Sequence, residues 1–82
     1  MKLYAITDNP TTRIGLELAE IKTCLIRTQD DFRQTLENLP YGEKLVIITE
    51  SLASKNADYL QEYRTKNLKV LVTIIPGENN DH

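Results

Sequence analysis

The sequence predicts an α/β fold, a three-layer sandwich in which a four-stranded parallel sheet lies between two layers of helices. Four short apolar segments alternate along the chain with amphipathic segments, as is typical of parallel strands joined by helical crossovers. The apolar segments are nearly continuous, which is expected of strands buried on both faces. With 82 residues, the chain is expected to form a single domain over residues 1–77, followed by a disordered polar tail at residues 78–82.

The first strand and helix are predicted close to the N-terminus. An apolar run over Leu3–Ile6 predicts the strand, and a turn at Thr7–Pro10 ends it. The segment Thr11–Glu20 predicts the helix, with Thr11 or Thr12 as its N-terminal cap. Three apolar residues recur there at helical spacing and are expected to form the inner side of the helix: Ile14, Leu18 and Ile21.

The second strand is predicted over Thr23–Ile26, and Cys24 within it is expected to be a core residue. Thr28 is followed three residues later by Asp31, which approximates a capping box and predicts the start of a second helix. Three apolar residues at helical spacing predict the buried side of this helix: Phe32, Leu36 and Leu39. The segment Pro40-Tyr41-Gly42 is expected to end it.

The third strand is predicted over Leu45–Ile48, and a third helix over Ser51–Arg64 with Ser51 or Ser54 as its cap. Small and apolar residues are expected on the inner side of this helix: Leu52, Ala53, Ala57, Leu60 and Tyr63. Lys66-Asn67 is expected to end it. The fourth strand is then predicted over Leu68–Ile75, where Pro76-Gly77 stops it.

The topology predicts that one face of the fourth strand is left without a helix. Right-handed crossovers in a flavodoxin-like or receiver-like sheet give the strand order 2-1-3-4. The first helix then lies alone on one face and can cover only the first two strands. We expect Leu71, Thr73 and Ile75 to point to the uncovered side. An exposed apolar patch of this kind usually marks a partner surface, so these residues and the following Pro76-Gly77 are the expected partner-binding residues.

The composition argues against several classes of function. The net charge is −2, from 10 basic and 12 acidic side chains, which gives no electrostatic footprint for nucleic acid. No segment approaches the roughly 20 apolar residues that span a bilayer, and Met1 leads into no secretion signal, so a cytoplasmic location is expected. The single histidine is His82, and no Gly-rich phosphate loop is present. We therefore expect no catalytic residue, no metal and no cofactor.

The strand ends offer one alternative interpretation. Ligands of open α/β sheets bind beyond the carboxyl ends of the strands, where the strand order reverses. Asp8 and Glu50 lie at that position and can in principle hold Mg²⁺, as in a small receiver-like or metal-binding regulatory domain. The preferred interpretation is that Asp8 caps a turn and Glu50 starts a helix, where the helix dipole favours an acid. The acidic pair and the fifth strand of receiver domains are not found in the sequence.

Short motifs between residue 3 and residue 77 follow one another in the order and spacing of a known family. Asp8 precedes the helical segment Gly15–Ile21, which reads GLELAEI and leads into the second strand. The third strand ends in Ile48-Thr49-Glu50 and enters its helix through Ser51-Leu52-Ala53. The fourth strand ends in Ile75-Pro76-Gly77. In these features together the chain resembles the F subunit of V-type (A/V-type) rotary ATPases.

The resemblance implies a non-catalytic part of the central rotor stalk. The implied partner is the long coiled-coil D subunit. The implied complex couples ATP hydrolysis or synthesis to the movement of protons or sodium ions, with this chain peripheral to the membrane. Family members usually continue past the fourth strand into a C-terminal helix, which would lie beside the first helix. Here Glu78–His82 follows instead, so either another subunit covers that face or the chain is a shortened variant.

Overall fold

The computed structural model describes residues 1–76, so the predicted polar tail at residues 78–82 lies outside the described residues. Its strands form one parallel sheet in the order β2-β1-β3-β4, which confirms the predicted strand order. The strands are β1 (Lys2–Thr7), β2 (Lys22–Leu25), β3 (Lys44–Thr49) and β4 (Val70–Ile75). The helices are α1 (Pro10–Leu18), α2 (Gln29–Glu37), α3 (Glu50–Lys55) and α4 (Ala57–Lys66).

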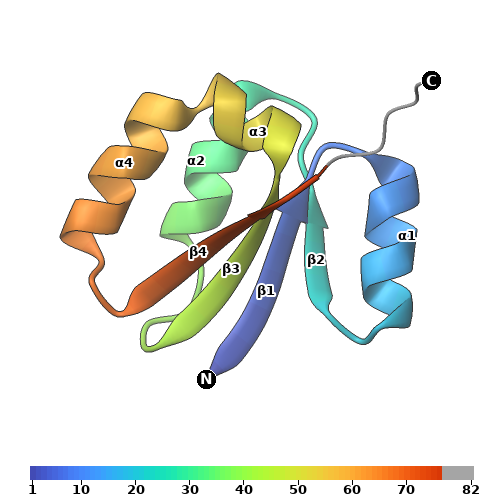
Figure 1. Ribbon diagram of the computed structural model, residues 1–82, viewed down its shortest axis with the longest axis horizontal. Coiled ribbons are helices and arrows are strands. Elements are labelled where there is room, and N and C mark those ends of the chain that lie inside the picture. The colour runs from blue at the N-terminus through green and yellow to red at the C-terminus, as the bar shows by residue number, and fades with distance from the viewer. Residues whose placement is uncertain (77–82) are drawn as a thin grey trace.

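The helices lie in two layers, as predicted. Figure 1 shows α1 on one side of the sheet and α2, α3 and α4 on the other. The buried core lies on the side of α2, α3 and α4, and it includes Phe32 and Leu36, whose side chains are almost fully buried. No residue of α1 is buried to that degree. The hydrophobic core is therefore built mainly on one face of the sheet.

The helix starts confirm one predicted cap and correct another. The backbone N–H of Asp31 donates to Thr28 Oγ1, and the backbone N–H of Thr28 donates to Asp31 Oδ2, each over 3.3 Å. This is the predicted capping box. At α1 the predicted threonine cap is wrong, because Asn9 Oδ1 accepts from the backbone N–H groups of Thr11 and Thr12 at 2.8 and 3.0 Å. Asparagine is among the strongest N-cap residues, and Pro10 at the next position suits a helix start.

The predicted third helix is in fact two helices that meet at Asn56. The buried side chain of Asn56 donates to the Leu52 carbonyl over 2.9 Å and so competes for an acceptor at the end of α3. The Asn56 backbone is non-helical, and its carbonyl accepts from Leu60 N–H at the start of α4. Thr49 and Asn56 occupy the N-cap positions, so the predicted caps at Ser51 and Ser54 are wrong. Ala57 is exposed, whereas the other predicted inner residues are buried: Leu52, Ala53, Leu60 and Tyr63.

Candidate functional site

The sheet face that carries α1 is only partly covered within residues 1–76. Helix α1 packs on β1 and β2, and Figure 1 shows no described helix on that side of β3 and β4. Val70 and Val72 of β4 pack against the core on the opposite face. Because side chains alternate along a strand, Leu71, Thr73 and Ile75 point to the partly covered face, as predicted.

A row of three leucines crosses this face. Leu3 of β1 is the register partner of Leu45 in β3, which in turn is the partner of Leu71 in β4. The side chains of Leu3 and Leu71 are 40% and 54% exposed. We use the term open face for this row and its neighbours on β3 and β4: Leu3, Leu45, Ile47, Leu71, Thr73 and Ile75. The prediction from sequence had found only the β4 members, because the register that aligns the leucines depends on how the strands pair.

Helix α1 adds further exposed apolar side chains. Ile14 and Leu18 were expected to face the sheet, but they are 54% and 81% exposed. Thr12 and Leu16, one turn apart, are half-buried instead. Residues two positions away along a helix project from a different side, so packing through Thr12 and Leu16 turns Ile14 and Leu18 toward solvent. The helical spacing of Ile14 and Leu18 was therefore predicted correctly, but the prediction that these residues face the sheet is wrong.

At the carboxyl ends of the strands, Asp8 is engaged in contacts with α3. Its carboxylate accepts a hydrogen bond from Ser51 Oγ at 3.0 Å and lies 3.6 Å from Lys55 Nζ. Glu50 is exposed in the first turn of α3, where an acid is favoured by the helix dipole. Within residues 1–76, no group of three or more His, Cys, Asp or Glu side chains is placed to hold a metal ion. The geometry of Asp8 is thus that of a structural link between β1 and α3.

The expected core position of Cys24 is wrong, because its side chain is exposed. Cys24 lies on β2, an outer strand of the sheet, and lines an open groove beside α2. Polar residues of α2 line the same groove, among them Gln34, Thr35 and Asn38. An apolar strand sequence cannot by itself distinguish an outer strand from a central one.

One comparison with known proteins identifies a family for the chain. The family model of the ATP synthase (F/14-kDa) subunit matches residues 3–82 of the chain. A search of curated proteins and a search of solved structures returned no significant match. In the part of the chain that the structure describes, no helix is both long and apolar enough to cross a membrane. The family match spans nearly the whole sequence, and the chain therefore belongs to the family of the F/14-kDa subunit of V-type ATP synthases.

Proposed function

We propose that the chain is a non-catalytic subunit of the central rotor stalk of a V-type ATPase and binds the coiled-coil D subunit through the open face. The observation that carries this proposal is the leucine row across β1, β3 and β4, in which Leu45 is half-buried and both Leu3 and Leu71 are exposed. Strands of parallel sheets are normally covered on both faces, and contiguous exposed apolar surface usually marks an interaction site. Burial of this surface contributes roughly 25 cal/mol per Å² of apolar area removed from water.

The dimensions of the open face suit one helix of a coiled coil. Neighbouring strands are about 4.8 Å apart, so β1, β3 and β4 together span about 10 Å. This span is close to the roughly 8–10 Å between the axes of packed helices. Since α1 lies over β1 and β2, a partner helix beside it would cover the rest of the face.

In this arrangement the partner-binding residues are the β4 members of the open face and the end of the strand. They are Leu71, Thr73, Ile75, Pro76 and Gly77, of which Gly77 lies outside the described residues. Leu71 contributes the largest exposed apolar side chain of these residues and is the expected anchor. The exposed Ile14 and Leu18 on α1 offer a second contact to the other helix of the coiled coil.

The proposed role is mechanical. The chain stiffens the shaft that couples ATP hydrolysis or synthesis to proton or sodium transport, on the cytoplasmic side of the membrane and without inserting into it. The nucleotide sites then belong to other subunits. The contacts of Asp8 with Ser51 and Lys55 at the strand ends suit this role, because they join two elements of the fold.

A binding measurement with matched leucine variants tests the proposal. Leu71→Asp places a charge on the open face, whereas Leu68→Asp changes a more exposed leucine (84%) that lies in the turn before β4. With the purified coiled-coil partner of the same organism, calorimetry should show binding that Leu71→Asp weakens at least about tenfold, by about 1.4 kcal/mol. Leu68→Asp should bind as the original chain does. Equal affinity of both variants, or no binding of the original chain, would reject the proposal.

A further inference from the structure

A buried lysine lies on the opposite side of the molecule from the open face. The side chain of Lys44, at the start of β3, is only 5% exposed. Its Nζ donates to the carbonyl oxygens of Pro40 at 2.7 Å and Gly42 at 3.1 Å. None of the ion pairs formed within residues 1–76 includes Lys44. An ammonium group has three N–H donors, and a buried charge is costly unless an opposite charge or enough hydrogen bonds compensate it.

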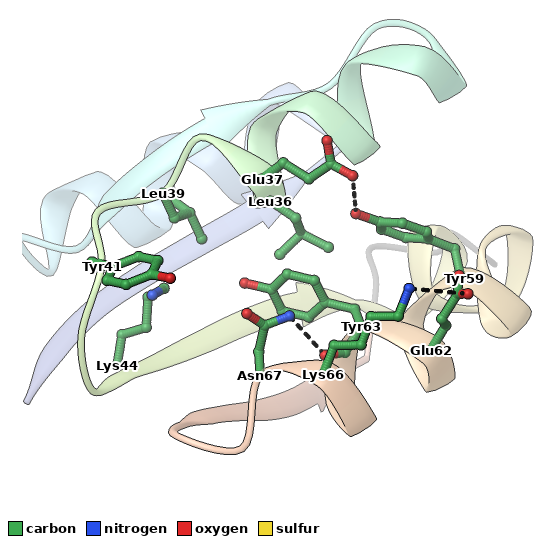
Figure 2. Close-up of a pocket in the computed structure, with 10 residues that line it drawn as sticks. All are labelled: Leu36, Glu37, Leu39, Tyr41, Lys44, Tyr59, Glu62, Tyr63, Lys66 and Asn67. Atoms are coloured by element: carbon green, nitrogen blue, oxygen red, sulfur yellow. Dashed lines mark hydrogen bonds and ion pairs between the residues drawn. The ribbon is translucent and has the colours of Figure 1, made fainter.

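Lys44 lines a pocket of about 260 Å³ between α2, α4 and the turn that joins α2 to β3. Leu36 and Leu39 form its apolar wall. Figure 2 shows the side chains of Tyr41, Lys44 and Tyr63 pointing toward the same end of the pocket. The hydroxyl of Tyr63 is a proton donor at neutral pH, as a tyrosine ordinarily is, and burial raises its pKa further. Tyr41 is fully exposed, so the buried donors at this end of the pocket are the Tyr63 hydroxyl and the Lys44 ammonium group.

The other charged groups of the pocket already have partners. Glu62 pairs with Lys66 at 3.5 Å, at the end of the pocket away from Lys44. The carboxylate of Glu37 accepts a hydrogen bond from the Tyr59 hydroxyl at 3.0 Å. Lys44 is thus the one charged residue lining this pocket for which no contact with an acidic or hydroxyl side chain is found within residues 1–76.

We propose that this pocket binds a carboxylate, whose oxygens accept hydrogen bonds from Lys44 Nζ and Tyr63 Oη. The aliphatic part of the ligand would lie against Leu36 and Leu39. The pocket is smaller than the roughly 300–1,000 Å³ of drug-sized sites, so it fits a short chain. The ligand is a short aliphatic carboxylate, either a free anion or the side chain of a glutamate on a partner protein. The site is separate from the open face and does not depend on the proposed coiled-coil contact.

An NMR titration of the isotope-labelled protein tests the site. Sodium propionate should produce saturable shifts in the amide signals of residues 41–44 and 63–67 and of Leu39, with a dissociation constant on the order of millimolar for so small a ligand. Sodium chloride at the same ionic strength should not produce these shifts. Lys44→Met should weaken binding at least about tenfold. The matched control Lys66→Met, which changes the exposed lysine at the other end of the pocket, should retain it.

Two further measurements complete the test. A short peptide with one glutamate, compared with its glutamine counterpart, distinguishes the two sources of carboxylate. Tighter binding of the glutamate peptide than of propionate indicates a partner side chain, whereas equal or weaker binding indicates a free anion. If Lys44→Met does not fold, Tyr63→Phe replaces it and should weaken binding about tenfold. The proposal is overturned if propionate gives no saturable shifts, or if the substitution that is tested leaves the affinity unchanged.

Discussion

The hydroxyl of Ser51 donates a hydrogen bond to the carboxylate of Asp8, although 43 positions separate the two residues. The Oγ–Oδ1 and Oγ–Oδ2 distances are 3.0 and 3.2 Å, so the hydroxyl lies between both oxygens. Lys55 Nζ approaches the same carboxylate at 3.6 Å. Asp8 follows β1 and Ser51 lies in α3, so this contact fixes the start of α3 against the end of the first strand.

The first prediction concerns this contact. Asp8→Asn and Ser51→Ala should each lower the free energy of unfolding by about 0.5–1.5 kcal/mol, because each weakens a partly exposed hydrogen bond. The double variant should lose less than the sum of the two single losses, because both changes remove the same interaction. Urea denaturation of the four proteins measures this coupling. Strictly additive losses would show that the two residues do not stabilise each other.

The second prediction concerns two buried threonines at the strand ends. Thr49 is 1% exposed, and its hydroxyl has no hydrogen-bond partner within the described residues. Thr7 is equally buried, but its Oγ1 accepts from the backbone N–H of Asn9 at 3.1 Å. Thr49→Val should therefore raise the free energy of unfolding by about 1 kcal/mol, because valine keeps the shape and removes an unsatisfied polar group.

Thr7→Val is the matched control for that change. It makes the same substitution at a hydroxyl that does accept a hydrogen bond, so it should lower the free energy of unfolding by about 1 kcal/mol. Denaturant titrations of the two variants measure the difference. A loss of stability in both variants would mean that the Thr49 hydroxyl has a partner in solution.

The third prediction is a loss of stability at alkaline pH. Burial and the hydrogen bond to Glu37 raise the pKa of Tyr59 from 10.0 to about 12. The folded state thus holds the phenol proton more tightly than the unfolded state. The protonated Tyr59 hydroxyl therefore contributes to the free energy of unfolding. This contribution is fully present below pH 10 and is lost as the pH rises from 10 to about 12. Denaturant unfolding at several pH values in this range should show the decline.

Tyr59→Phe separates this effect from other groups that titrate at high pH. The variant keeps the aromatic ring beside Phe32, at 6.4 Å between ring centroids, and loses only the hydroxyl. Its stability should fall less steeply with pH than that of the original chain, while Tyr63, whose pKa burial also raises, titrates in both. In addition, Glu37→Gln should lower the pKa of Tyr59, measured by tyrosinate absorbance. An identical pH slope for Tyr59→Phe would contradict the assignment.

The sequence was sufficient to predict features that depend on local spacing or on handedness. The capping box of Thr28 and Asp31 depends on two residues three positions apart, and it is found as expected. The strand order follows from right-handed crossovers, and it is confirmed. The side of α1 that faces the sheet could not be obtained this way, because Ile14 and Leu18 have helical spacing in either orientation. Tertiary packing decides which of the two orientations of α1 the protein adopts.

The helix break at Asn56 and the full extent of the open face could not be predicted from the sequence. Asparagine is tolerated inside helices, so only the observed contact of its side chain with the Leu52 carbonyl identifies a break. For the candidate partner site, the β4 residues could be predicted from alternation along the strand. Leu3 and Leu45 could not, because their place beside Leu71 depends on the pairing register.

The last prediction concerns Glu20, which directly follows the C-cap residue Ala19 of α1. Its φ angle is 65°, in the left-handed region where a side chain other than glycine costs about 1 kcal/mol or more. Its backbone N–H donates to the Glu17 carbonyl at 2.9 Å, and that of Ile21 donates to the Leu16 carbonyl at 3.1 Å. These two bonds form a Schellman motif, in which glycine is the preferred residue at the position of Glu20. Glu20→Gly should therefore raise the free energy of unfolding by about 1 kcal/mol.

Glu20→Ala is the control, because alanine removes the charge but keeps the Cβ atom and hence the strain of the left-handed conformation. For a domain of this size, the glycine variant should melt about 4–8 °C higher than the original chain, and the alanine variant should not. Thermal unfolding followed by circular dichroism measures both. If the melting temperature of the alanine variant rises as much as that of the glycine variant, the increase comes from removing the Glu20 charge. The backbone of Glu20 then stores no strain.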